Sequence, residues 1–241
     1  DFSIGEPERR RFFIDQTLSM YDLLYIDINR KYKKILKTRN LLLKEEKYDL
    51  LEAYDYSLAE VGAEIVKKRD RAIFQFNQLF SKLYEQVSDI DSVTLKYDSQ
   101  WKDLSIDEII KILFEKRETD KIMKVSMSGP HRDKIKFVRK GKPFISTAST
   151  GQRRLTALLL RICQASFYTS ITSKKPVLLM DDVLLELDPD KREKVTILLP
   201  EYDQLFCTFL PGEPYERYMK HDTKILNVEN GVFSERISNS K

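Results

Sequence analysis

The chain has 241 residues, enough for one or two domains with a sizeable core, and its 42 basic and 38 acidic residues nearly cancel. A net charge of only +4 excludes a uniformly basic nucleic-acid-binding protein, so such binding would need a local basic patch. The two histidines and two cysteines show no metal-ligand pattern, and we expect Cys163 and Cys207 to be buried thiols. No apolar run reaches the roughly 18–20 residues of a membrane span, and no signal peptide is visible; both favour a reducing cytoplasm without membrane contact.

Two long helical patterns occupy the first third of the chain. Residues 1–15 are expected to form a short lead-in that ends an N-terminal lobe and contains the basic run Arg9–Arg11. Apolar residues then recur at three- and four-residue steps over about 16–47 and about 49–87, which predicts two amphipathic helices. Their lengths and the short break between them favour an antiparallel helical arm, with an ordinary globular helix pair as the alternative.

Shorter elements are predicted on either side of residue 150. Alternation predicts strands at 92–97 and 134–139, with a hairpin turn at Gly141, and 124–127 is a candidate strand. Ser105 and Glu108 have the spacing of a capping box that begins a short helix ending near Lys116. Later in the chain we expect a helix over 189–199, a buried strand over 204–209 and a hairpin with Asn230-Gly231 at its turn.

The stretch from Ser149 to Asp188 organises the chain. Ser149 and Thr150 favour the cap of a helix whose apolar spacing starts directly behind them. The free N–H groups of a helix N-terminus, with Gly151 allowing close approach, suit an anion such as phosphate. An ordinary capped helix is the alternative interpretation of this motif.

Two carboxylates follow an apolar strand within the same stretch. The run Val177–Met180 lacks alternation, which predicts a strand buried on both faces of a parallel sheet. Functional residues gather at the C-terminal ends of such strands, where Asp181 suits Mg²⁺ and Asp182 could orient or deprotonate a water. The alternative, two solvated loop acids, is disfavoured by Asp188 shortly afterwards. The predicted fold is α/β. The order of capped helix, apolar strand with two acids, and Asp188 resembles the second half of an ABC-type ATPase head, which implies the C-terminal part of such a head, a mostly parallel sheet with flanking helices, plus a helical arm subdomain. We expect an arm over 16–123 and the head over 124–241.

Four sequence blocks resemble the RecF family of bacterial recombination mediators, which are ABC/SMC-like DNA-repair ATPases. The blocks, spread over nearly the whole chain, are Pro7–Phe12, Arg39–Lys44, Gly129–Asp133 and Ser149–Asp188. The resemblance implies a protein that binds ATP and DNA and forms a homodimer with ATP. It also implies action at single-strand gaps in duplex DNA, together with RecR and RecO, to load the recombinase.

The resemblance implies roles for individual residues. Ser149, Gly151 and Gln152 correspond to the signature that contacts ATP held by the opposite protomer. Asp181 corresponds to a Mg²⁺ ligand, and Asp182 stands where other ABC ATPases often carry a catalytic glutamate. Asp188 corresponds to the D-loop at the dimer interface.

Two features depart from the family pattern. None of the seven glycines starts a Gly-x-x-x-x-Gly-Lys-Ser/Thr motif, so the Walker A phosphate cradle is absent. The chain begins with Asp1, and we expect a fragment that lacks its N-terminal Walker A part and is inactive alone. Thr208 lies where ABC ATPases often place a switch histidine.

DNA contacts are harder to assign because the charge is mixed. The candidates are Arg9, Arg10, Arg11, Arg132, Lys134 and Lys136, with the arm residues Lys31, Lys33, Lys34 and Arg39 next. Solvated helix faces are an equal alternative for the arm lysines, and His131–Asp133 favours an internal polar network over a ligand site. Two other functions stay open: a non-catalytic fragment that docks a partner protein, and the head of another ABC/SMC-type ATPase.

Overall fold

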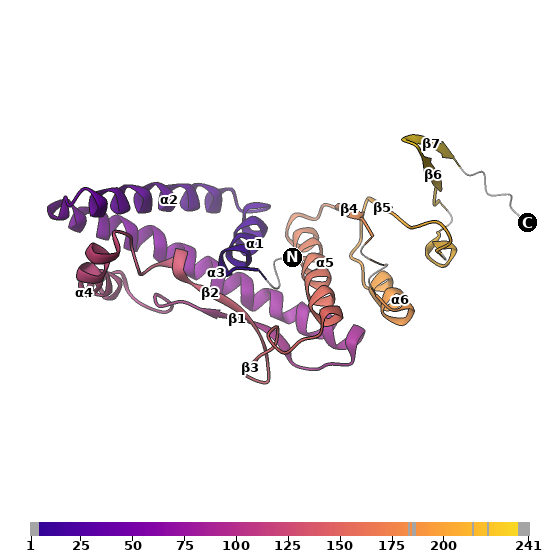
Figure 1. The fold of residues 1–241 in the computed structure, drawn as a ribbon, viewed down its shortest axis with the longest axis horizontal. Helices are drawn as coiled ribbons and strands as arrows, with labels where there is room; N and C mark the ends of the chain where they lie inside the picture. The colour runs from indigo at the N-terminus through magenta and orange to yellow at the C-terminus, as the bar shows by residue number, and fades with distance from the viewer. Residues whose placement is uncertain (1–4, 183, 185–186, 214, 221, 236–241) are drawn as a thin grey trace, which may run out of the picture.

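The structure is a computed structural model that describes residues 5–182, 184, 187–213, 215–220 and 222–235. The molecule is elongated, with a helical arm at one end and a small C-terminal hairpin at the other (Figure 1). No helix in the described ranges is long and apolar enough to span a bilayer.

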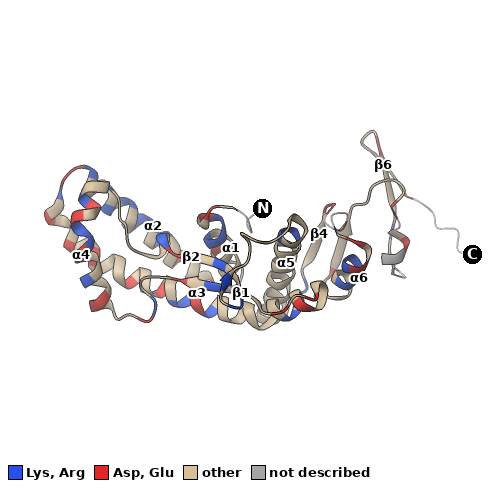
Figure 2. Ribbon diagram, turned by 60° about the horizontal axis from the view of Figure 1, so that its bottom comes forward, with Lys and Arg blue, Asp and Glu red and all other residues tan. Residues whose placement is uncertain are grey.

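The arm consists of two long helices that lie side by side. Helix α2 (Leu23–Lys44) and helix α3 (Leu51–Ser88) are joined by the short 3₁₀ helix η1 (Tyr48–Leu50), as the apolar periodicity predicted. With 38 residues, α3 is about 57 Å long. Figure 2 shows basic and acidic residues intermixed along the arm.

The start of the chain differs from the expected lead-in. Helix α1 (Pro7–Ser19) begins with a proline at its first turn, and Asp22 then caps α2 by accepting a hydrogen bond from the Tyr25 amide at 3.0 Å. The expected helix over 16–47 is therefore two helices with a break at residues 20–22. The periodicity missed this break because its apolar positions continue on both sides of it.

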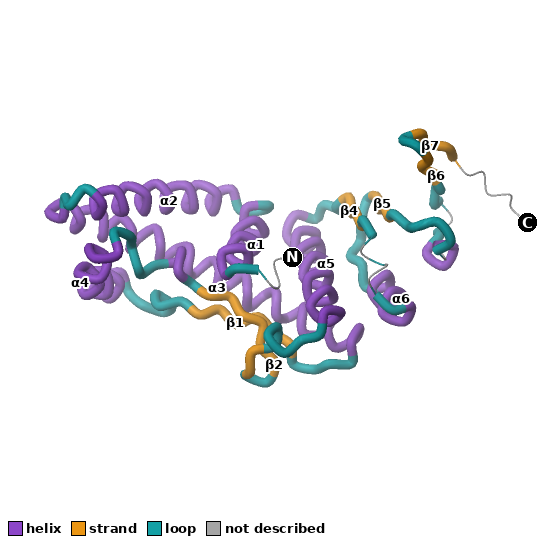
Figure 3. The backbone as a smooth tube through the Cα atoms, in the orientation of Figure 1, coloured by secondary structure: helices purple, strands orange, loops and turns teal. Residues whose placement is uncertain are grey.

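A three-stranded antiparallel sheet lies along α3 (Figure 3). Strand β1 (Val93–Asp98) pairs with β2 (Lys134–Arg139), which continues through the turn at Gly141 into β3 (Lys142–Pro143). Helix α4 (Ile106–Met123) connects β1 to the η2 turn (Pro130–Arg132) and begins with the predicted capping box. Because β1 pairs with β2, the sheet crosses the boundary expected at residues 123–124, and that division stays a prediction.

Two expectations for this middle region were wrong. Helix α4 continues to Met123 rather than ending near Lys116. Residues 124–127 do not form a strand, because side chains take their backbone donors: Asn40 Oδ1 accepts from the Ser126 amide and Asp120 Oδ1 from the Met127 amide, each at 2.8 Å.

The C-terminal part contains helix α5 (Thr150–Thr172), which packs on α3, and strand β4 (Val177–Met180) parallel to β5 (Gln204–Cys207). Helix α6 (Pro189–Ile197), the 3₁₀ helix η3 (Tyr215–Tyr218) and the hairpin of β6 (Leu226–Glu229) and β7 (Val232–Glu235) complete it. Asn230 and Gly231 have φ values of 50° and 79°, as the predicted hairpin turn requires. Cys163 is buried and Cys207 half-buried, and both are free thiols as expected.

The prediction that β4 and β5 are buried strands was wrong for one face of the pair. Leu179 is 75% exposed and Phe206 51% exposed, whereas Met180 is buried. Within the described ranges β4 and β5 form a sheet of two strands, so no further strand flanks them, and an open apolar face results.

Candidate functional site

The predicted signature lies at the N-terminus of α5. Ser149 Oγ accepts from the Gln152 amide at 3.3 Å, and Gln152 Oε1 accepts from the Ser149 amide at 2.8 Å, which completes a capping box. Tyr84 of α3 donates to the Gln152 carbonyl at 3.3 Å and so attaches this turn to the arm. The Nε2 group of Gln152 makes no hydrogen bond within the described residues, and it remains available as a donor.

Gly151 is exposed in the first turn of α5. A methyl group added at its Cα would meet no atom within 4 Å. Packing among the described residues therefore gives no reason for a glycine here. A group that approaches the helix N-terminus from outside would use the open space, as phosphates do at such termini.

The carboxylates of Asp181 and Asp182 meet at the C-terminal end of β4. Both are exposed, and both approach the hydroxyl of Thr208, which lies 2.9 Å from Asp181 Oδ1 and 3.2 Å from Asp182 Oδ1. Two neighbouring carboxylate oxygens suit Mg²⁺, which takes one or two carboxylates and completes its shell with water and phosphate. No group of three or more His, Cys, Asp or Glu side chains that could hold a metal occurs among the described residues.

Asp188 caps α6. Its Oδ1 accepts from the Lys191 amide at 3.0 Å, and its Oδ2 pairs with the Lys191 ammonium group. These bonds hold the pKa of the Asp188 carboxyl below its ordinary value. No hydrogen bond in the described part of the chain joins Asp188 or the Asp181–Asp182 pair to the signature on α5.

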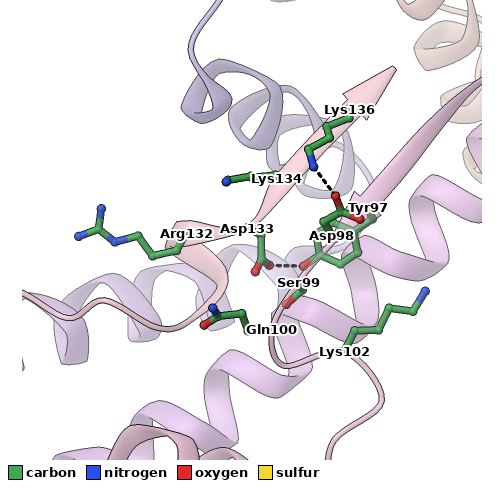
Figure 4. A pocket seen from close by; sticks show the side chains of 9 residues that line it. All are labelled: Tyr97, Asp98, Ser99, Gln100, Lys102, Arg132, Asp133, Lys134 and Lys136. Atoms are coloured by element: carbon green, nitrogen blue, oxygen red, sulfur yellow. Dashed lines mark hydrogen bonds and ion pairs between the residues drawn. The ribbon is translucent and has the colours of Figure 1, made fainter. Parts of the chain in front are cut away.

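A basic pocket of about 490 Å³ lies where β1 ends and β2 begins (Figure 4). Its rim contains three of the predicted DNA-contact residues, Arg132, Lys134 and Lys136, together with Lys102. Arg132, Lys134 and Lys136 are all exposed, and Lys136 pairs with Asp98 at 2.6 Å. Arg132 Nε donates to the Ser126 carbonyl at 3.2 Å, and its guanidinium extends away from the Tyr97–Asp133 hydrogen bond.

Arg10 and Arg11 make contacts inside the protein. Arg10 Nε donates to the Ile135 carbonyl and Arg11 Nη1 to the Asp133 carbonyl, each at 2.7 Å. Burial lowers the pKa of both guanidinium groups. These bonds attach α1 to the start of β2, and contact of Arg10 and Arg11 with DNA stays a prediction. Arg9 is exposed.

Buried ion pairs, which the sequence did not reveal, lie inside the arm. Arg39, expected on the surface, is 0% exposed, with Nε 2.8 Å from Asp55 and Nη1 2.7 Å from Asp120. Arg69 pairs with Asp15 at 2.8 Å in the same way. The sequence signal was present, because Arg39, Asp55 and Arg69 fall on the apolar faces of their helices.

His131 and Asp133 belong to the interior, as the sequence indicated. His131 Nε2 bonds to the Ser126 carbonyl at 2.9 Å, so Nδ1 accepts from the Tyr32 hydroxyl at 2.7 Å in the neutral ring. Burial lowers the pKa of His131 to about 4. Asp133 accepts from the Tyr97 hydroxyl, and burial raises its pKa.

Comparison with known proteins identifies relatives over nearly the whole chain. No protein-family model matches. The chain is 52% identical over 235 residues to the DNA replication and repair protein RecF of Treponema pallidum, covering 98% of this chain and 67% of that protein. It is 32% identical over 240 residues to RecF of Bacteroides thetaiotaomicron, covering 96% of this chain and 64% of that protein.

Solved structures give the same result. A structure described as the recombination mediator protein RecF with ATP in the RecFOR pathway superposes with a TM-score of 0.80 and 27% identity. That match covers 96% of this chain and 64% of the other, so the chain spans about two thirds of the proteins it matches. Its arm and its α/β part are those of an ABC-type ATPase head with a helical arm. The chain belongs to the RecF family.

Proposed function

We propose that this chain forms the arm and the C-terminal part of the ATPase head in a RecF-type recombination mediator. The assembled protein is an ATP-dependent dimer that clamps DNA at single-strand gaps during replication and repair. With RecR and RecO it helps to load the recombinase. The observation that carries this proposal is the open capped terminus of α5 at Gly151, in a chain whose relatives are DNA replication and repair proteins.

The signature would serve ATP held by the opposite protomer. Ser149 caps the helix, Gly151 leaves room above it, and the free Nε2 group of Gln152 can donate to the γ-phosphate. The positive end of the α5 dipole favours the same anion. The phosphate cradle itself must come from a Walker A segment outside this sequence.

The carboxylate pair would supply the metal and water chemistry. Asp181 would hold Mg²⁺, which when bound would supply neutralisation of phosphate charge during transfer. Asp182 orients the attacking water or accepts its proton. Asp188, at the start of α6, lies in the D-loop and would face the second protomer.

The basic pocket would contact the DNA backbone. Arg132 and Lys134 are exposed cations on one rim, with Lys136 beside them, and phosphate oxygens are bound by such groups. Arg9 is a further candidate. A double variant, Arg132→Ala with Lys134→Ala, should weaken binding to gapped DNA and reduce the salt-dependence slope by about 2. The matched control is Lys111→Ala with Lys116→Ala on α4, which removes two exposed lysines outside the pocket.

The decisive experiment adds a separately expressed N-terminal lobe that carries Walker A. ATP and gapped DNA are titrated against this chain with and without that lobe, and hydrolysis and dimerisation are measured. Hydrolysis should require both parts, and Asp182→Asn should reduce it by about 10²–10⁴ while ATP-dependent dimers persist. Unchanged hydrolysis in the Asp182→Asn protein would falsify the catalytic assignment.

A second candidate function is a partner-docking fragment without nucleotide chemistry. The exposed apolar face of Val177, Leu179 and Phe206 favours it. In that case the added lobe would restore neither ATP binding nor hydrolysis.

A further inference from the structure

Thr208 lies beside the carboxylate pair because of the parallel pairing of β4 and β5. Met180 is opposite Cys207 in that register, and the Thr208 amide donates to the Met180 carbonyl at 3.1 Å. The next residue on each strand therefore continues the pairing, which places Thr208 against Asp181 and Asp182. Its position is set by backbone bonds rather than by a mobile loop.

The hydroxyl of Thr208 makes three polar contacts with these two residues. It accepts a hydrogen bond from the Asp182 amide at 2.9 Å. As a donor, its oxygen lies 2.9 Å from Asp181 Oδ1 and 3.2 Å from Asp182 Oδ1. Because a hydroxyl has only one proton, it donates to one carboxylate at a time while the amide bond is kept.

The amide bond matters because of the backbone conformation at Asp182. Its φ is +50°, in the left-handed region that L-residues adopt at a cost of about 1 kcal/mol or more. This turn directs the Asp182 amide toward β5, where the Thr208 oxygen accepts from it. Asp182 stands where other ABC ATPases often carry a glutamate. Because an aspartate is one methylene shorter, the Asp182 carboxylate stays close to the Thr208 hydroxyl.

We propose that Thr208 is a positioning residue that holds Asp181 in a geometry suited to a divalent cation and fixes Asp182 beside it. This role rests on the proposed function of the pair. Thr208 lies where a switch histidine was expected, and in this proposal its role is to hold the two carboxylates in position.

The test compares Thr208→Val, which keeps the branched shape, with Thr208→Ser, which keeps the hydroxyl. Thr208 is exposed and valine favours strands, so neither change removes core packing. Thr94→Val on β1 is the matched control, because the Thr94 hydroxyl makes no hydrogen bond to the described residues and lies on a different sheet. In the ¹⁵N-labelled chain, hydrogen exchange of the Asp182 amide and the affinity for Mn²⁺ are measured without nucleotide.

Thr208→Val should speed exchange of the Asp182 amide and weaken Mn²⁺ binding, each by about two- to tenfold, the range of one hydrogen bond. Thr208→Ser and Thr94→Val should leave both quantities near the wild type. Unchanged amide exchange in Thr208→Val overturns the proposal, and faster exchange with unchanged Mn²⁺ affinity restricts Thr208 to the turn and overturns its positioning role.

An Asp181→Asn variant separates this proposal from the proposed function. If that variant binds Mn²⁺ as the wild type does, the metal role of Asp181 fails. The amide-exchange result still decides whether Thr208 holds the turn.

Discussion

The buried ion pairs around Arg39 in the arm and the exposed groups at Gly151, Asp181 and Asp182 use polar chemistry in opposite ways. Around Arg39 each carboxylate is matched by a cation or a donor of the same chain, and the cluster is closed to solvent. At Asp181, Asp182 and Gly151 the polar groups face outward.

The difference separates groups that hold the fold from groups available to a ligand. A buried charge without partners is costly, so the interior carries complementary sets. An exposed carboxylate pair or helix terminus needs no partner within the protein, because water forms hydrogen bonds with it until a ligand binds. The predictions below test this separation, from the largest expected effect to the smallest.

Arg39→Met should destabilise the protein most. It leaves the buried carboxylate of Asp120 without a cation and Asp55 with Arg117 alone, and breaking a buried pair in this way costs about 3–5 kcal/mol. The free energy of unfolding in urea is the measurement. Arg30→Met, which removes an exposed partner of Asp27, is the control and should change little. Equal effects of the two substitutions would contradict the comparison.

Lowering the pH should reduce the free energy of unfolding through protonation of His131. Its pKa is lowered to about 4 in the fold against about 6.5 when unfolded, so the unfolded state binds more protons between these values. The resulting loss of unfolding free energy is about 3 kcal/mol as the pH falls from 6.5 to 4. His131→Gln can keep bonds to Tyr32 and Ser126 without titrating there. Its pH profile should be flatter, and parallel profiles would contradict the assignment.

Two glycines should respond differently to alanine. A Cβ on Gly62 would lie 2.4 Å from the Trp101 ring, so Gly62→Ala should cost about 1–3 kcal/mol of stability. Gly151→Ala meets open space and should keep or slightly raise stability, yet it should reduce ATP hydrolysis once Walker A is supplied. Thermal denaturation and hydrolysis rates measure the two effects. Loss of stability in Gly151→Ala would mean that the site has an internal packing role.

The smallest effect compares two capping boxes. Ser105→Ala and Ser149→Ala remove the same cap from α4 and α5, and each should cost about 1 kcal/mol of stability. Only Ser149→Ala should also lower ATP hydrolysis in the assembly with Walker A. If Ser105→Ala lowers hydrolysis equally, the effect comes from stability alone.

The sequence predicted local structure well because the signals were local. Helix periodicity, the caps at Ser105 and Ser149 and the Asn230-Gly231 turn depend on residues a few positions apart. The network of Arg39 with Asp120 spans 81 residues, and no short-range pattern joins them. The contact of Thr208 with Asp181 and Asp182 depends on strand register, which no short-range spacing contains. The sequence did not predict the open face of β4. An apolar run indicates that a strand tends to be buried, but it does not show which element covers it.

Helix α3 is long enough to connect the signature on α5 to the tip of the arm. Its C-terminal half touches the start of α5 through Tyr84 and the Gln152 carbonyl, while its N-terminal end lies at the arm tip. A tilt of about 5° at the signature end of a helix about 57 Å long displaces the other end by about 5 Å. That displacement is perpendicular to the helix axis, so a small tilt at the signature end becomes a sideways movement of the arm tip.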